Sequence, residues 1–200
     1  MSIKILSYPA DTAVMIKYLD LSAKMKYHIK NNVRCFMEIR LTTIEDLDEV
    51  MEIYKKARQF MREHDNPAQW LGGKPTRQQI EADIARGAGY VCTHNGIIEG
   101  VLCFFKGTDP TYKTIYGGEW LDDEPYAVVH RIASSGKFKG IGTFMMEWAE
   151  SQHGNIRIDT HEDNYVMQNM LKKLGYSYCG IIHLENGDPR LAYQKVTKAK

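Results

Sequence analysis

The sequence carries almost no excess charge and lacks any long apolar run. Its 26 Lys and Arg residues against 25 Asp and Glu residues leave a net charge of +1, which is too small for a protein that binds nucleic acid through the phosphate backbone. No stretch approaches the roughly 18 uninterrupted apolar residues of a membrane span, and Pro9 and Asp11 break the opening apolar run that a signal peptide would need. We therefore expect a cytoplasmic protein that has neither nucleic acid nor a membrane as its partner.

Cysteine is also scarce. The four cysteines show no paired spacing such as C-x-x-C, and they are Cys35, Cys92, Cys103 and Cys179. This spacing indicates neither a zinc knuckle nor a redox pair. We expect reduced thiols and no metal site.

The composition that is present is that of a chain able to fold. Its 200 residues are 44% apolar and 26% charged, which fits one domain of ordinary size with an appendage. The first 36 residues carry six basic and two acidic groups, or +4, whereas the remainder carries −3. The two ends of the chain therefore differ in character.

The boundary between these two parts is expected at Met37, where a short strand begins. Apolar residues recur at helical spacing over residues 11–30, which predicts one amphipathic helix before that boundary. They are Val14, Tyr18, Leu21 and Met25. We therefore divide the chain into an N-terminal extension, residues 1–36, and a domain of residues 37–200. Contact of the extension with a second copy, in a homodimer, stays open.

Within the domain, the apolar pattern switches between the periods of strands and helices. A strand, two helices and a hairpin with its turn at His94-Asn95-Gly96 come first. A strand, a helix, a strand, a helix and two closing strands follow. The expected ranges are, in order, 37–41, 47–57, 76–86, 90–93, 97–105, 126–133, 143–152, 155–161, 164–174, 176–183 and 191–195.

A glycine-bearing loop, residues 137–143, joins a predicted strand to a predicted helix and carries the clearest chemical signal. Glycines let backbone N–H groups approach an anion, and a helix start adds about half a positive charge, so this loop suits a pyrophosphate. A nucleoside triphosphate loop requires a lysine where Thr143 stands, and a dinucleotide fingerprint requires a third glycine where Met145 stands. A plain glycine turn between strand and helix is the remaining alternative.

Two motifs of this region resemble those of the GNAT family of acyl-CoA-dependent N-acetyltransferases. The segment Lys137-Phe138-Lys139-Gly140-Ile141-Gly142 is similar to the family's Q/R-x-x-G-x-G/A pattern at a helix start, with lysine in the first place. Asn164 and the later Lys173-Leu174-Gly175-Tyr176 resemble an asparagine followed by a helix that ends in a K-x-G-F-like turn. The resemblance covers about residues 37–196 and leaves the first 36 outside.

This resemblance implies an α+β (mixed α/β) fold with a central, mostly antiparallel sheet flanked by helices. The middle strands, 126–133 and 155–161, should splay apart and admit the pantetheine arm of acetyl-CoA, the implied co-substrate. Its pyrophosphate would meet the amides of 137–143, and amides near Ile132 and Ala133 would serve the developing oxyanion. The implied cofactor-binding residues are Ile132, Ala133, Lys137, Phe138, Lys139, Gly140, Ile141, Gly142, Thr143 and Asn164.

Acyl transfer to an amine also requires a group that removes the ammonium proton, and His130 is the candidate base. Strand alternation predicts that His130 shares a face with Tyr126, Val128 and Ile132, close to the expected thioester. A structural histidine bonded within the sheet is the equally weighted alternative.

The neighbouring strand carries a polar stripe in which Asp159 and His161 share a face with Arg157. Such a stripe is unusual in a strand expected to be central, since ionisable groups there need partners. Asp159 and His161 are interpreted as acceptor-site or proton-relay residues, with a structural charge network as the alternative.

The proton for the leaving thiolate has no obvious donor, because Leu171 stands where many family members place a tyrosine. Tyr165, Tyr178 or a water molecule remain as donors, or the thiolate leaves unprotonated. Trp70 and Trp120 lie in segments that fit an acceptor wall, and the alternative for both is a place at the edge of the core.

These features predict an N-acetyltransferase that moves an acetyl group from acetyl-CoA to a primary amine of a small molecule or peptide. The alternative is a non-catalytic acyl-CoA-binding sensor module of the same fold, which the missing tyrosine keeps open. A nucleotide-dependent enzyme is the third reading, and its motifs fit less well.

Overall fold

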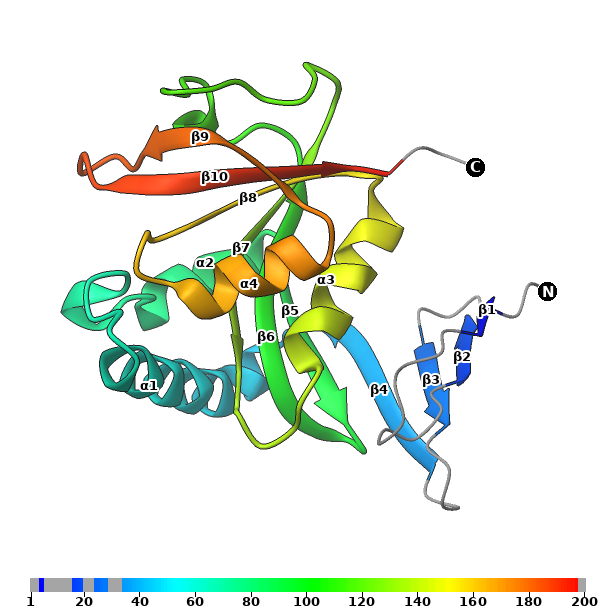
Figure 1. Cartoon of the computed structure of the whole chain (residues 1–200). Helices are drawn as coiled ribbons and strands as arrows, with labels where there is room; N and C mark the ends of the chain where they lie inside the picture. The colour runs from blue at the N-terminus through cyan, green and yellow to red at the C-terminus, as the bar shows by residue number, and fades with distance from the viewer. Residues whose placement is uncertain (1–3, 6–15, 20–23, 29–33, 198–200) are drawn as a thin grey trace.

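The computed structural model describes residues 4–5, 16–19, 24–28 and 34–197. Within these ranges the strands form one sheet in the order β1-β2-β3-β4-β5-β6-β7-β8-β10-β9 (Figure 1). Every neighbouring pair is antiparallel except β7 and β8, which are parallel. The strands are β1 (Lys4–Ile5), β2 (Ile16–Leu19), β3 (Lys24–His28), β4 (Arg34–Leu41), β5 (Gly89–His94), β6 (Ile97–Lys106), β7 (Ala127–Ser134), β8 (Asn155–Thr160), β9 (Ser177–His183) and β10 (Pro189–Val196). The main helices are α1 (Leu47–Glu63), α2 (Arg77–Ala85), α3 (Ile141–Gln152) and α4 (Tyr165–Lys173).

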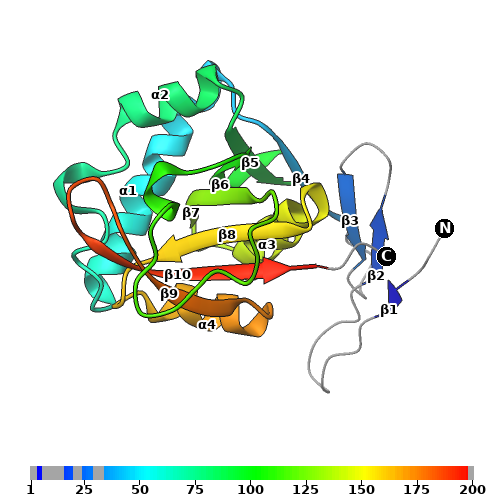
Figure 2. The same cartoon turned by 90° about the horizontal axis from the view of Figure 1, so that it is seen from above.

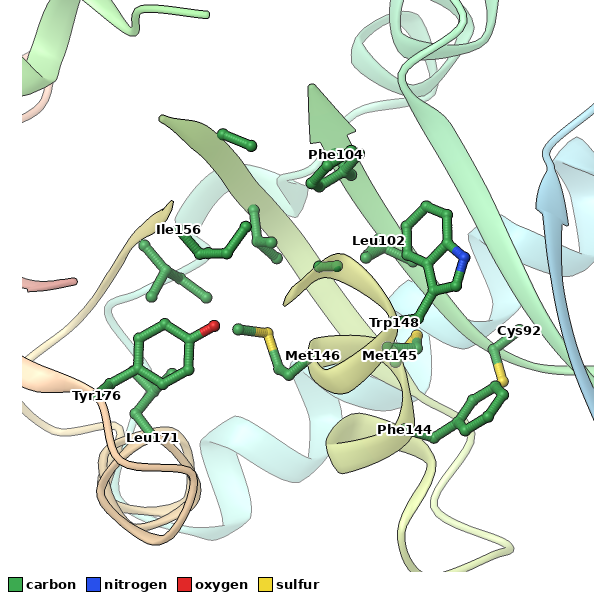
Figure 3. Close-up of a cluster of buried hydrophobic side chains, with 14 of the residues drawn as sticks. Cys92, Leu102, Phe104, Phe144, Met145, Met146, Trp148, Ile156, Leu171 and Tyr176 are labelled. Atoms are coloured by element: carbon green, nitrogen blue, oxygen red, sulfur yellow. The ribbon is translucent and has the colours of Figure 1, made fainter. Parts of the chain in front are cut away.

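Helices cover both faces of the sheet, which confirms the expected α+β fold (Figure 2). On one face, α1 and α2 bury a cluster that includes Val50, Ile80 and Val101. On the other, the apolar side of α3 packs on the strands, and Leu171 of α4 joins the same cluster (Figure 3). Full burial of each such side chain contributes about 1.5–3 kcal/mol. No helix within the described ranges is long and apolar enough to cross a membrane.

The expected hairpin over 90–93 and 97–105 is confirmed as β5 and β6. Its two turn residues, Asn95 and Gly96, have φ angles of 52° and 84°. Positive φ at both central positions twists the turn in the sense that matches the strands, and Asn-Gly is the pair that adopts it most readily. The turn that connects β5 to β6 is therefore encoded by the local sequence.

The amphipathic helix expected over 11–30 is wrong where the structure describes that segment. Residues Ile16–Leu19 and Lys24–His28 are strands β2 and β3, and β3 pairs antiparallel with β4. The sequence of β3, Lys-Met-Lys-Tyr-His, alternates polar and apolar side chains with period two, which is the strand pattern. Val14 and Leu21 lie outside the described residues. The domain boundary at Met37 stays a prediction, and Met37 itself lies inside β4.

The expected separation of the two middle strands is confirmed. The parallel pairing of β7 and β8 covers Ala127–Val129 opposite Ile156–Ile158 and no further. From His130 to Ser134, β7 keeps its ladder with β6, whereas β8 continues against β10. The sheet therefore opens at its centre, between the end of β7 and the end of β8.

Candidate functional site

The opening of the sheet begins at a bulge in β7. The register between β6 and β7 shifts beside Cys103, and Arg131 has a φ of 53°, the left-handed region. That conformation costs about 1–2 kcal/mol for a residue with a side chain, so the surroundings must hold it. The Tyr54 hydroxyl of α1 donates to the Arg131 carbonyl at 2.8 Å, and the Arg131 guanidinium donates twice to Asp83 of α2, at 2.6 and 2.8 Å.

These bonds are strong because their partners are buried. Asp83 is 4% exposed, and its carboxylate also accepts from Arg86 at 2.8 Å. Burial raises the pKa of the Tyr54 phenol above its usual value, so this hydroxyl stays a donor. Side chains of α1 and α2, two helices that precede β7 by many residues, therefore fix the geometry of the bulge.

The bulge resets which side chains of β7 share a face. Val128 and His130 contact the cluster around Tyr112, but Ile132 packs with Val129 on the α3 face. The prediction that Ile132 shares a face with His130 is wrong, because the extra residue at the bulge shifts the alternation by one. Both residues still reach the same cavity, described below.

His130 is held between two carboxylates. Its Nε2 lies 2.9 Å from Asp109 Oδ2, and its Nδ1 lies 3.5 Å from Asp159 Oδ1. Asp159 Oδ1 also accepts a 2.7 Å hydrogen bond from the Tyr112 hydroxyl. His130 and Asp159, two of the predicted catalytic residues, are thus brought together, and Asp109 and Tyr112 join them.

The electrostatics of this cluster determine where its protons sit. Burial alone would raise the pKa of Asp109, but hydrogen bonds from His130 and Thr111 outweigh it and hold the pKa well below its usual range. Burial, reinforced by Asp159, raises the pKa of the Tyr112 phenol well above its usual value. Asp109 is therefore an ionised acceptor, so Nε2 of His130 carries the proton of their hydrogen bond, and Nδ1 is the ring nitrogen that faces Asp159.

A cavity of about 600 Å³ occupies the region where β7 and β8 separate. Charged and polar side chains from distant segments line it beside His130 and Asp159, including Gln69, Trp70, Asp109, Arg131, Thr160, Asn164 and Arg190. Trp70 also packs edge-to-face on Tyr54, with ring centroids 5.6 Å apart. Trp120 takes the place at the core edge, where it packs against Tyr112 and donates to the Tyr112 carbonyl at 3.0 Å.

A second cavity of about 300 Å³ adjoins the first, and Ile132 and Asn164 line both. Its walls come from α1, from the start of α4 and from the end of β7 with the following loop. Of the predicted cofactor residues, Ile132, Ala133, Gly142 and Asn164 line this cavity. Tyr165, which is largely exposed, lines it too, whereas Leu171 is fully buried in the core.

The glycine loop leads from this cavity into α3. Gly140 caps the helix with a φ of 89°, a conformation that costs glycine nothing. The first amides of α3 have no carbonyl partner within the helix, so those of Ile141, Gly142 and Thr143 are available to an anion. The Ile141 side chain is buried in the core, so this residue offers its backbone alone.

Two side chains of the loop point to protein partners. Lys137 Nζ lies 3.6 Å from Glu99, a buried carboxylate that also accepts from the Ser135 hydroxyl. The Phe138 ring packs on His94 at 4.1 Å, and the lysine at 139 is exposed. These contacts hold the loop in place, and the Lys137 amide also donates to the Ser135 hydroxyl at 3.1 Å.

Asn164 and His161 have different roles. The Asn164 side chain caps α4 by accepting from the Met167 amide at 3.1 Å, and it donates to Gln69 at 2.7 Å. His161 lies just past the end of β8, where its Nδ1 accepts from the Asp163 amide at 3.2 Å. His161 is absent from the lining of both cavities, so the structure does not bring it to His130.

Arg157, a further charged residue of β8, makes structural contacts. Its guanidinium lies over the rings of Trp120 and Tyr126, at 4.3 and 4.0 Å, and donates to the Asp122 carbonyl. These contacts form a structural network.

Within the described residues, no group of three His, Cys, Asp or Glu side chains is placed to hold a metal ion. The three cysteines described in full are buried and free.

Sequence reasoning missed several residues that the fold brings to these cavities from other elements, whereas Gln69 lies beside Trp70 in the segment expected to form an acceptor wall. The missed residues are Tyr54, Asp83, Asp109, Tyr112, Arg131 and Arg190. The one local signal was Arg131 itself, a charged residue next to His130 in a strand expected to be central. The others are identified by three-dimensional contact alone.

Comparisons with known proteins give matches among solved structures. A scan against models of protein families finds no match, and neither does a search of curated proteins. An acetyltransferase of the GNAT family from Streptococcus agalactiae 2603 is 36% identical, with a TM-score of 0.74, over 82% of this chain and 96% of that one. Two more distant structures share the fold alone. Naa50 from Arabidopsis thaliana, in complex with the bisubstrate analogue CoA-Ac-MVNAL, is 13% identical over 80% of this chain and 97% of that one, with a TM-score of 0.52. The protein yncA from Salmonella typhimurium, solved with its cofactor acetyl-CoA, is 15% identical over 82% and 95%, with a TM-score of 0.51.

Proposed function

This chain belongs to the GNAT family of acetyltransferases, and we propose that it moves an acetyl group from acetyl-CoA to a primary amine of a small molecule or peptide. The observation that carries the proposal is the opening between β7 and β8, which leads from the glycine loop to the His130 cluster. A pyrophosphate site at one end and a proton acceptor at the other are the two parts that acyl transfer to an amine requires.

The residues of the smaller cavity fit acetyl-CoA. The amides of Gly140 to Thr143 suit a pyrophosphate, and the free side of β7 from Ile132 to Ser134 offers backbone groups to an extended pantetheine arm. Bound acetyl-CoA supplies a thioester whose carbonyl carbon accepts the amine. The β7 amides at Ile132 and Ala133 are the proposed donors to the carbonyl oxygen.

His130 is the proposed general base for the acceptor. An alkyl ammonium with a pKa near ~10 is mostly protonated at neutral pH, so it must lose a proton before it attacks. The carboxylates of Asp109 and Asp159 line the same cavity and attract the ammonium. Nδ1 of His130 takes its proton, and Asp109 holds the ring by accepting from Nε2.

Tyr165 is the proposed donor for the departing thiolate. It lines the smaller cavity beside Asn164, whereas Tyr178 packs on Tyr193 in the far strands β9 and β10. The hydroxyl of a tyrosine is a hydrogen-bond donor and so has a proton to give. Tyr165→Phe tests this role, with an expected fall in kcat and an unchanged affinity for acetyl-CoA.

Incubation with acetyl-CoA and a mixed panel of amines, with free thiol as the readout, tests the proposed activity. We expect thiol release that depends on at least one amine and that is lost in His130→Ala. Tight binding of acetyl-CoA without thiol release against any amine would instead support a non-catalytic sensor. Thermal stabilisation by ATP or NAD, and none by coenzyme A, would support a nucleotide-dependent enzyme.

A further inference from the structure

A buried arginine lies in the wall of the larger cavity, away from the proposed proton-transfer residues. Arg190, near the start of β10, is 5% exposed and lines this cavity. Burial of a guanidinium is costly unless anionic partners compensate for the lost water. The partners of Arg190 therefore indicate whether its charge is fully paired within the protein or is able to bind an anionic ligand.

Within the described residues, none of the hydrogen bonds that Arg190 makes goes to a carboxylate. Its hydrogen bonds go to two carbonyl oxygens, of Pro189 at 2.7 Å and of Gln69 at 3.4 Å. The ion pair recorded for it is with Asp188, a half-exposed turn residue, at 3.9 Å. By contrast, the cavity's other buried arginine, Arg131, has two hydrogen bonds of 2.6 and 2.8 Å to Asp83. Arg190 is therefore a buried cation of this cavity that still suits an anion, and Lys74, which is exposed, lines the same cavity.

The position of Arg190 relative to the proton-transfer residues follows from the strand register. Ala192 of β10 is paired with Asp159 of β8, and Arg190 lies two residues along β10 on the same face. Such a diagonal pair of residues has Cα atoms about 7–8 Å apart. Asp159 and Arg190 thus form two ends of one wall of this cavity, one anionic beside His130 and one cationic.

We propose that the acceptor is an amine that also carries a carboxylate, with the amine at His130 and the carboxylate on Arg190. The planar guanidinium fork matches a carboxylate, which binds it through paired hydrogen bonds. The spacing of the two ends suits a compact amino acid with a few carbons between its two groups. This inference rests on the proposed acetyl transfer, because it names the class of its acceptor.

The test compares each acid with its own amide. Glycine, β-alanine and 4-aminobutyrate are each assayed beside the corresponding primary amide, with acetyl-CoA saturating and thiol release as the readout. We expect kcat/KM to favour the best acid over its amide by roughly 10- to 100-fold, the size of a hydrogen bond to a charged group. Arg190→Gln should remove that preference by lowering kcat/KM for the acid far more than for its amide, and Arg190→Lys should restore part of it.

The outcomes separate this inference from the function beneath it. Thiol release with amides at rates equal to or above those with acids would overturn the carboxylate inference and leave acetyl transfer standing. No thiol release with any acid or amide, nor with the wider amine panel, would overturn both. Because the acid and amide are compared on the wild-type protein, a misfolded Arg190→Gln variant, detected by its melting temperature, does not remove the test.

Discussion

The two halves of strand β7 differ although they are continuous in sequence. Ala127, Val128 and Val129 are fully buried and pair with β6 on one side and β8 on the other. The half from His130 to Ser134 pairs with β6 and borders two cavities. The first half holds the sheet together, and the second lines the two cavities in which we propose that the substrates bind.

One residue separates these halves. The left-handed conformation of Arg131 bends β7, and Tyr54 of α1 and Asp83 of α2 hold that conformation. A strand that continued its regular pairing would close the gap to β8 and bury His130 against it. A single bulge, fixed by tertiary contacts, therefore separates the part of β7 that pairs on both sides from the part that borders the cavities.

The largest expected effect comes from the first residue beyond the paired half. We predict that His130→Ala lowers kcat/KM by roughly 10²–10⁴, the usual contribution of a general base. Affinity for acetyl-CoA should change little, and the rise of rate with pH that deprotonation of a histidine base gives should disappear.

The matched control for this variant is His183→Ala, which removes an exposed histidine of β9. It should keep the wild-type rate and pH profile. If His130→Ala also keeps the wild-type pH profile, the role of base passes to Asp159, His161 or water.

The next effect concerns the cofactor end of the opening. Gly142 lines the smaller cavity in the first turn of α3. We predict that Gly142→Trp weakens acetyl-CoA binding by roughly 100-fold, because overpacking a close contact costs on the order of 1–3 kcal/mol. Gln152→Trp adds the same bulk at the exposed far end of the same helix and should bind normally. Calorimetry measures both, and equal affinities would remove the loop from the cofactor site.

A smaller effect is expected at the residue that orients the base. We predict that Asp109→Asn lowers kcat/KM about tenfold, the low end of what a charge-assisted hydrogen bond contributes. The sign of its pH effect on stability follows from the lowered pKa of Asp109. Stability from this carboxylate is fully present above the ordinary aspartate pKa of about 3.9 and is lost progressively as pH falls from there toward the lowered pKa of the folded state. The difference in stability between wild type and variant should therefore be constant above that pH and shrink below it, which acid unfolding curves measure.

The smallest effect is expected from the segment that contributes to neither half of β7. No proposed site residue precedes Met37, so we predict that a chain beginning there keeps the acetyl-transfer rate and nearly the same melting temperature. The pairing of β3 with β4 puts this prediction at risk, because the truncation removes a strand that borders the domain's sheet. A fall of several degrees would show that the first strands stabilise the domain and that the boundary is wrong.

The parts of the site that the sequence predicts are those encoded by neighbours in the chain. Gly140 and Gly142 form a strand-to-helix joint whose spacing is readable, and Asn95-Gly96 encodes a hairpin turn. The bulge at Arg131 is not readable, because the hydroxyl and the carboxylate that hold it come from residues 77 and 48 positions away.

The same reasoning explains which contacts around the candidate site the sequence does not predict. His130 was found from its place in a strand before the loop, but its partner Asp109 lies 21 positions earlier, in a loop without a pattern. His161 follows Asp159 at strand spacing, yet β8 ends at Thr160, so the alternation stops before it. Strand ends and bulges depend on packing, which composition and period do not record.

The most direct test of the central claim is amide hydrogen exchange along β7 with and without coenzyme A. We expect coenzyme A to slow exchange at amides within residues 130–134 and at Gly140 to Thr143, where backbone groups are free to bind it. Exchange at Ala127, Val128 and Val129, which are already paired on both sides, should not change. Protection confined to other strands, or equal protection in both halves of β7, would contradict the assignment of the opening as the cofactor site.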